Sequence, residues 1–90
     1  MSNQVEINEI EMVYMSNSHV IPSFRITDYY DDIVCELPKH TNSDFELLKA
    51  ICTSDNEGVR DIVKNIKSCK KGVTINQHFY EFDEISEFLP

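Results

Sequence analysis

Alternating polar and apolar residues predict a β-strand near the start of the chain. Between Glu9 and Met15, apolar residues of one phase recur at every second position, the period of a half-buried strand: Ile10, Met12 and Tyr14. Val5 and Ile7 occupy the opposite phase. This change of phase predicts a β-bulge or a late strand start near Asn8.

Two further strands are predicted before the middle of the chain. Val20 to Ile26 has apolar residues on one phase, and Pro22 lies within it. Because proline cannot donate a ladder hydrogen bond, we expect an edge strand or an interruption at Pro22. The acidic stretch from Thr27 to Asp32 predicts a turn into a third strand through Ile33 to Leu37, which Pro38 ends.

The central segment has the pattern of two helices. Ser43 followed by Glu46 is a capping box that predicts a helix of about ten residues, and Ser54 with Glu57 predicts the start of another. Apolar residues of the second helix recur at helical spacing: Val59, Ile62, Val63, Ile66 and Cys69. Gly72 suits the left-handed position just beyond its end.

The last twenty residues predict a hairpin and a helical turn. Val73 to Ile75 and His78 to Phe82 flank Asn76-Gln77, a two-residue turn or part of a longer loop because Gln77 is unfavourable there. Asp83 is the expected cap of a final helical turn. The predicted class is α+β: an antiparallel sheet, built from an N-terminal two- or three-stranded meander and a C-terminal hairpin, packed against two central helices with a short C-terminal helical turn.

Composition predicts one globular, cytoplasmic domain over residues 1–90 without a cofactor. The acidic start differs from a signal peptide, and no apolar run is long enough for a membrane helix. Three cysteines without a C-x-x-C pair predict reduced, buried thiols and no local zinc motif: Cys35, Cys52 and Cys69. No catalytic signature is present, so we predict that the protein is not an enzyme. A small enzyme with a Cys–His pair or a carboxylate-bound metal is the second alternative.

Charge is distributed unevenly along the chain. The formal net charge is −8, and the carboxylates predominate toward both ends whereas most Lys and Arg residues lie between them. Direct binding to nucleic acid or to an anionic membrane is disfavoured because both require clustered basic residues. A basic partner protein is the natural complement.

The candidate partner-binding residues are acidic or aromatic and belong to the predicted sheet. Glu9 and Glu11 should point from one face of a strand about 6.8 Å apart, and the others should lie at the end or edge of the same sheet. Tyrosines are enriched at binding hot spots, although one of an adjacent pair can point into the core. The predicted surface comprises Glu9, Glu11, Asp28, Tyr29, Tyr30, Asp31, Asp32 and Glu36.

These observations predict an inhibitor that docks on the basic surface of a nucleic-acid-binding protein or nuclease complex, as a monomer or a homodimer. In size and charge the chain resembles the small acidic inhibitors that phages use against bacterial defence, including anti-CRISPR and anti-restriction proteins. Carboxylate rows can imitate a phosphate backbone. The first alternative is an immunity protein or antitoxin that neutralises a cationic nuclease toxin. The interpretation without a binding function is that the acidic surface only maintains solubility.

Overall fold

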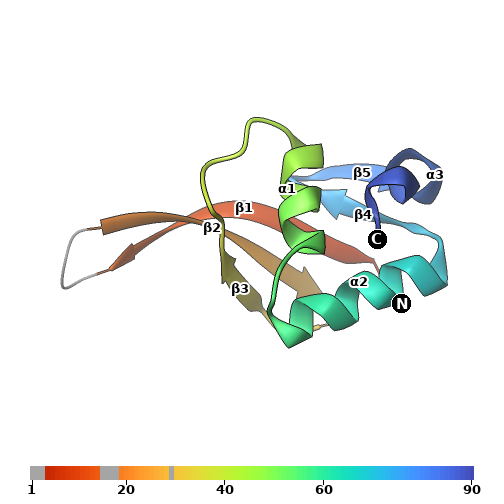
Figure 1. The fold of residues 1–90 in the computed structure, drawn as a ribbon, viewed down its shortest axis with the longest axis horizontal. Helices are drawn as coiled ribbons and strands as arrows, with labels where there is room; N and C mark the ends of the chain where they lie inside the picture. Colours follow the sequence, from red (N-terminus) through yellow and green to blue (C-terminus); the bar gives the residue numbers. More distant parts are fainter. Residues whose placement is uncertain (1–3, 15–18, 29) are drawn as a thin grey trace.

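The protein has a mixed α+β fold with a five-stranded, mostly antiparallel sheet (Figure 1). The computed structural model describes residues 4–14, 19–28 and 30–90. The predicted α+β class is therefore confirmed. In chain order the elements are β1 (Val5–Tyr14), β2 (His19–Asp28), β3 (Ile33–Glu36), α1 (Asp44–Cys52), α2 (Glu57–Cys69), β4 (Gly72–Ile75), β5 (His78–Glu81), α3 (Phe82–Ile85) and the 3₁₀ turn η1 (Ser86–Phe88).

The strand order β3-β2-β1-β4-β5 contains one parallel pair. Neighbouring strands pair antiparallel except β1 and β4, which run parallel at Glu6 opposite Thr74 and Ile7 opposite Ile75. The sequence predicted an antiparallel sheet, so this pair is a correction. A parallel neighbour requires a long crossover connection, and the segment from β3 to β4 that contains α1 and α2 supplies it.

One hydrophobic core joins the sheet to the helices. Buried residues of β1, β2 and β4 pack in the same cluster as the buried faces of α1 and α2. Gly58, in the first turn of α2, lies so close to β3 that an added Cβ would be 3.0 Å from Ile33 Cδ1. Ile85 is buried, and Phe88 and Leu89 pack against the cluster, so the C-terminal segment folds back onto the core.

The β1–β2 hairpin projects beyond this core (Figure 1). Its register is continuous from Val5 opposite Asp28 to Tyr14 opposite His19, so the bulge predicted near Asn8 is wrong. The apolar phase changes because only the inner half of the hairpin covers the core. We call the outer residues, Glu11–Tyr14 and 19–22, the hairpin arm. Four of its apolar residues are well exposed: Met12 (38%), Val13 (62%), Tyr14 (45%) and Val20 (51%).

Pro22 lies within an uninterrupted ten-residue strand, contrary to the predicted break. Its carbonyl accepts a hydrogen bond from the Leu37 N–H at 2.9 Å, so Pro22 faces the β3 side. The N–H and C=O of one strand residue point to the same side. The missing donor therefore faces Leu37, just beyond the last β3 pair, Ser23 opposite Glu36, and the pairing of β2 with β1 continues past Pro22.

The helix starts differ in detail from those predicted. Ser43 caps α1 by accepting from the Glu46 N–H at 3.2 Å, but the Glu46 carboxylate accepts from Asn42 N rather than from Ser43 N. The cap of α2 is Asn56, not Ser54. Asn56 accepts from the Val59 N–H at 3.2 Å, and an asparagine is as good an N-cap as a serine.

Two other local predictions are also corrected. The left-handed residue that ends α2 is Lys70, with φ 56°, whereas Gly72 has φ 138° and begins β4. The final helical turn is capped at Glu81 rather than Asp83, and the Glu84 carboxylate accepts from the Glu81 N–H at 2.8 Å.

The β4–β5 connection is a two-residue turn rather than a longer loop. Asn76 and Gln77 both have positive φ, 50° and 69°, as a type I′ turn requires. Asn76 tolerates this conformation well, and its side chain makes further contacts described below. Among the described residues, no helix has the length and apolar character needed to cross a membrane.

Candidate partner-binding surface

The predicted carboxylates fall into two groups on the sheet. Glu9 and Glu11 lie on β1 and share one face, as predicted. Asp28 ends β2, Asp31 and Asp32 lie in the loop that follows, and Glu36 ends the edge strand β3. Glu36 lies opposite Ser23, five residues or about 17 Å along β2 from Asp28. We call the other three residues, Asp28, Asp31 and Asp32, the sheet-end carboxylates. Tyr29 lies outside the described residues.

The two groups do not form one continuous surface. Asp28 is opposite Val5, so Glu9 and Glu11 lie four and six residues farther along the strand, about 13 Å and about 20 Å away. Glu36 is also on the other face of the sheet. Register aligns it with Ser23 and Ile10, whereas Glu9 aligns with Phe24, a buried residue of the helix-covered face.

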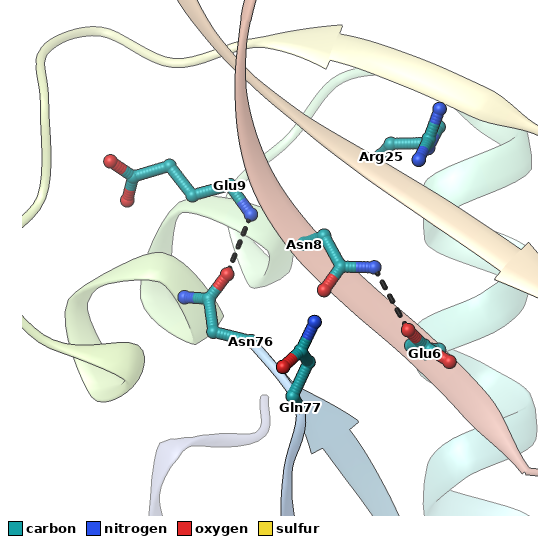
Figure 2. Close-up of a pocket in the computed structure, with 6 residues that line it drawn as sticks. All are labelled: Glu6, Asn8, Glu9, Arg25, Asn76 and Gln77. Carbon is teal, nitrogen blue, oxygen red and sulfur yellow. Dashed lines mark hydrogen bonds between the residues drawn. The ribbon is translucent and has the colours of Figure 1, made fainter.

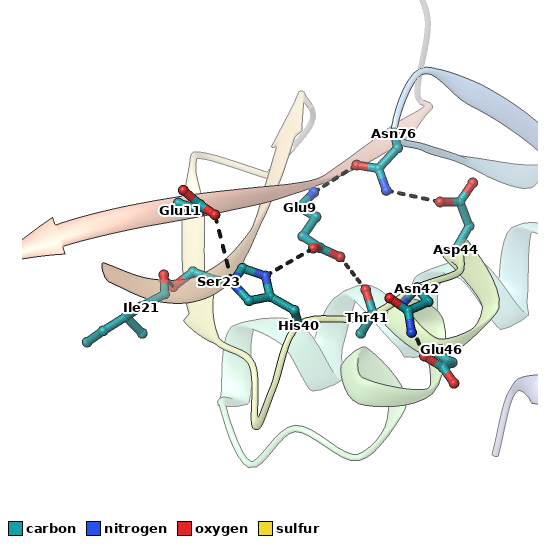
Figure 3. Close-up of polar contacts among 10 residues, drawn as sticks. All are labelled: Glu9, Glu11, Ile21, Ser23, His40, Thr41, Asn42, Asp44, Glu46 and Asn76. Carbon is teal, nitrogen blue, oxygen red and sulfur yellow. Dashed lines mark hydrogen bonds and ion pairs between the residues drawn. The ribbon is translucent and has the colours of Figure 1, made fainter. Parts of the chain in front are cut away.

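Glu9 and Glu11 are engaged within the protein, around His40 (Figure 3). His40 Nδ1 lies 3.6 Å from Glu9 Oε1, and His40 Nε2 lies 3.8 Å from Glu11 Oε1. The Thr41 hydroxyl donates a hydrogen bond to the other Glu9 oxygen. The Glu9 side chain is only 24% exposed, against 63% for Glu11. Glu9 is thus a structural contact more than a free binding residue.

These contacts extend through Asn76 to α1 and β5. The Asn76 side chain accepts from the Glu9 N–H at 2.9 Å and donates to Asp44 Oδ1 at 3.0 Å. The Tyr80 hydroxyl donates to Asp44 Oδ2 at 2.7 Å. This hydrogen bond to the carboxylate, together with burial, raises the pKa of Tyr80 to about 12. The network joins four segments that are distant in sequence, so no local sequence signal indicated it.

The sheet-end carboxylates, in contrast to Glu9 and Glu11, have no ion-pair partner among the described residues. Asp28, Asp31 and Asp32 are all exposed. Within the described part of the chain, the carboxylates that form ion pairs are Glu9, Glu11 and Asp55, so no Lys, Arg or His side chain forms an ion pair with the sheet-end group. Several uncompensated negative charges at one end of a sheet produce a local field that attracts cations.

Tyr30 does not stand free beside these carboxylates. It is half-buried and packs against the hydrophobic core. The alternative that one of the two adjacent tyrosines points into the core agrees with the position of Tyr30. At this end of the sheet, the described residues available to a partner are chiefly carboxylates.

An open polar pocket of about 420 Å³ lies beside the β4–β5 turn (Figure 2). It is lined by Glu6, Asn8, Glu9, Arg25, Asn76 and Gln77. Asn8 Nδ2 donates to Glu6 Oε1 at 3.1 Å. The carboxylate, amide and guanidinium groups of this lining can hydrogen-bond a polar ligand.

The cysteines are distributed over β3 and the two helices. Cys35 and Cys52 are partly buried, and burial raises the pKa of each thiol. Cys69 is exposed, so its predicted place in the core is wrong. In residues 4–14, 19–28 and 30–90, no three His, Cys, Asp or Glu side chains converge in a way that could hold a metal ion.

Comparison with known proteins adds no family to this description. No protein-family model matches the chain, and no match was found among curated proteins or solved structures.

Proposed function

We propose that this protein is a non-enzymatic, cytoplasmic, acidic inhibitor that occupies the basic, nucleic-acid-binding surface of a partner protein. The observation that supports the proposal is the uncompensated charge of the sheet-end carboxylates. An exposed group of three carboxylates that form no ion pair within the described residues favours a cationic surface over nucleic acid or an anionic lipid.

The positive charge of α2 indicates which side of the protein a basic partner approaches. Arg60, Lys64, Lys67, Lys70 and Lys71 are all exposed on or directly after this helix. A basic partner is repelled from α2 and attracted to the end of the sheet. We therefore centre the interface on Asp28, Asp31 and Asp32, with Glu11 and Glu36 as peripheral contacts and Glu9 as a structural residue.

The partner's surface is expected to be basic because the partner also binds a nucleic acid. A protein that binds a nucleic acid presents Lys and Arg side chains that neutralise phosphates. Protein carboxylates at the same positions compete with those phosphates, and such electrostatic contacts chiefly raise the association rate and weaken with salt. A phage inhibitor of bacterial defence and an immunity protein for a nuclease toxin are two biological settings for this mechanism.

The test is capture of the partner followed by competition with nucleic acid. The tagged chain is used to isolate a binding protein from the host, and fluorescence anisotropy then measures binding of that protein to a labelled DNA or RNA duplex. We expect the wild-type chain to displace the duplex stoichiometrically. Asp31→Lys combined with Asp32→Lys should weaken displacement at least about a hundredfold, since each reversal replaces attraction with repulsion.

A matched control reverses charge on α2. Lys64→Glu combined with Lys67→Glu should displace the duplex as well as the wild type or slightly better. If the α2 variant fails while the Asp31 and Asp32 variant competes normally, the sheet-end interface is refuted. A captured protein that is a nuclease toxin favours the immunity alternative, and a captured component of a defence complex favours the inhibitor.

A further inference from the structure

The hairpin arm presents two long sheet edges that no other strand in the described part of the chain covers. β4 pairs with β1 only at Glu6 and Ile7, and β3 pairs with β2 only from Ser23 to Ile26. Farther out, the arm is a two-stranded ribbon (Figure 1). An unpaired edge with free backbone groups is a template for pairing with another strand.

The two edges of the arm differ in the backbone N–H and C=O groups that are available to pair with another strand. On β1 the Ile7 carbonyl accepts from Asn76 N, so odd-numbered residues point their backbone groups away from β2. Beyond the Glu9 N–H, which donates to Asn76, the outward groups belong to Glu11 and Val13. The β2 edge contains Pro22, which has no N–H and whose carbonyl is already bonded to Leu37. The β1 edge is therefore the one competent to add a strand.

Charge indicates which strand can pair there. Residues 12–24 contain no Asp, Glu, Lys or Arg, and this is the longest uncharged run in the chain. A basic partner gains little from such a segment. Residues 12–14 of this run lie on the β1 edge, where a second copy of a chain with net charge −8 meets no like charge, whereas the carboxylates elsewhere repel it. The exposed apolar residues of the arm add surface that a dimer would bury.

We propose that two copies of the chain associate through the β1 edges of their arms, antiparallel and two-fold symmetric, to form one continuous sheet. Such an interface is self-complementary because each copy contributes the same strand. The proposal does not rest on the acidic interface, since it involves no sheet-end carboxylate and leaves α2 exposed, and only the peripheral contact Glu11 belongs to both surfaces.

Side-chain pairing selects a register centred on Met12. Directly opposite residues share a face, so this register pairs Met12 with Met12 of the second copy and Ile10 with Tyr14 of the second copy. Glu11 then lies opposite Val13 of the second copy. A register centred on Glu11 places two carboxylates directly opposite each other, which is destabilising.

The first experiment measures association of the full chain by sedimentation equilibrium. From about 1 to about 100 µM, we expect the wild type to reach twice the chain mass of 10.5 kDa. Val13→Pro should raise the dimer dissociation constant at least about tenfold because it removes an outward N–H. It keeps the β1–β2 ladder, since Val13 N points away from β2, and far-UV circular dichroism checks the fold.

The second experiment is disulfide trapping in a background that carries Cys69→Ser, which removes the exposed native thiol. Opposed Met12 residues form a non-hydrogen-bonded pair with Cα atoms about 4.5 Å apart, within the range of a disulfide. Met12→Cys should therefore cross-link efficiently under mild oxidation, whereas Val13→Cys and the exposed β3 control Val34→Cys should not.

Several outcomes would overturn the proposal. A wild-type chain that remains monomeric at about 100 µM excludes the second copy as the occupant of the arm. A dimer that persists unchanged in Val13→Pro excludes the β1 edge. Cross-linking through Val34→Cys in place of Met12→Cys moves the interface to another strand. None of these results bears on the competition experiment for the acidic surface.

Discussion

The inner and outer halves of the β1–β2 hairpin have the same backbone pairing and opposite surroundings. Register is one-to-one along both halves. In the inner half, Val5, Ile7, Phe24 and Ile26 are buried against the helices, while in the outer half Met12, Val13, Tyr14 and Val20 are exposed. A segment can therefore have strand propensity and regular pairing without burying apolar residues that stabilise the fold. An apolar β-sequence contributes to the core only where another layer covers it.

The largest expected effect comes from making the same substitution in each half. Val5→Ala removes methyl groups from a residue that is 5% exposed and should lower the free energy of unfolding by about 2 kcal/mol, from lost transfer energy plus a cavity. Val20→Ala, in the arm, should change it by less than about 0.5 kcal/mol. Urea unfolding at one protein concentration measures both. Equal costs would show that the arm is covered by another layer in solution.

Tyr30 and Asp31 allow a second comparison, between a residue packed against the core and an exposed neighbour at the end of the sheet. Because this side chain packs against the core, Tyr30→Ala should cost about 1 to 2 kcal/mol of unfolding free energy. Its exposed neighbour gives the control, and Asp31→Asn should cost less than about 0.5 kcal/mol. Urea unfolding of the two variants separates packing from surface charge. A stable Tyr30→Ala chain would return Tyr30 to the candidate interface.

Asn76 lies at the boundary between the two halves, where β4 stops pairing with β1. Asn76→Ala removes its hydrogen bonds to Glu9 N and Asp44 and places alanine at positive φ. We expect a loss of about 1 kcal/mol in unfolding free energy. Amide hydrogen exchange should accelerate most at the Glu9 N–H. Unchanged protection there would mean that Asn76 does not mark the boundary.

The smallest effect concerns Tyr80 and alkaline pH. Its pKa is raised to about 12 from an ordinary value of 10, so the stabilising contact with Asp44 is fully present below pH 10 and is lost as pH rises through about 12. Tyr80→Phe should remove this part of the alkaline loss of stability and cost less than about 1 kcal/mol at neutral pH. Absorbance near 295 nm should show one late-titrating tyrosine in the wild type only.

Local patterns predicted most of the elements but not their partners. The amphipathic spacing of α2 and the Ser43 cap of α1 were confirmed because both depend on residues within a few positions of each other. The choice of Asn56 over Ser54 as the α2 cap was missed because both residues can cap a helix. The parallel β1–β4 pair involves segments more than sixty residues apart, which no local pattern relates.

The candidate site shows the same division. The alternating positions of Glu9 and Glu11 placed them on one face of a strand, and the net charge indicated a basic partner. The contacts of Glu9 with His40, Thr41 and Asn76 could not be predicted, because they join the β1 strand to a loop and a turn that meet only in the folded chain. Among the candidate residues, Glu9 and Glu11 form ion pairs, and the sheet-end carboxylates form none.

The sequence by itself determined the α+β class, the amphipathic faces of the helices and the excess of negative charge, because each depends on residue type and short-range spacing. Tertiary structure alone decided which half of the first hairpin is buried, which carboxylates are compensated and which sheet edge is open. These properties depend on where the helical layer ends across the sheet. That limit is set by the packing of α1 and α2, whereas the alternation of apolar residues continues into the arm regardless of what covers it.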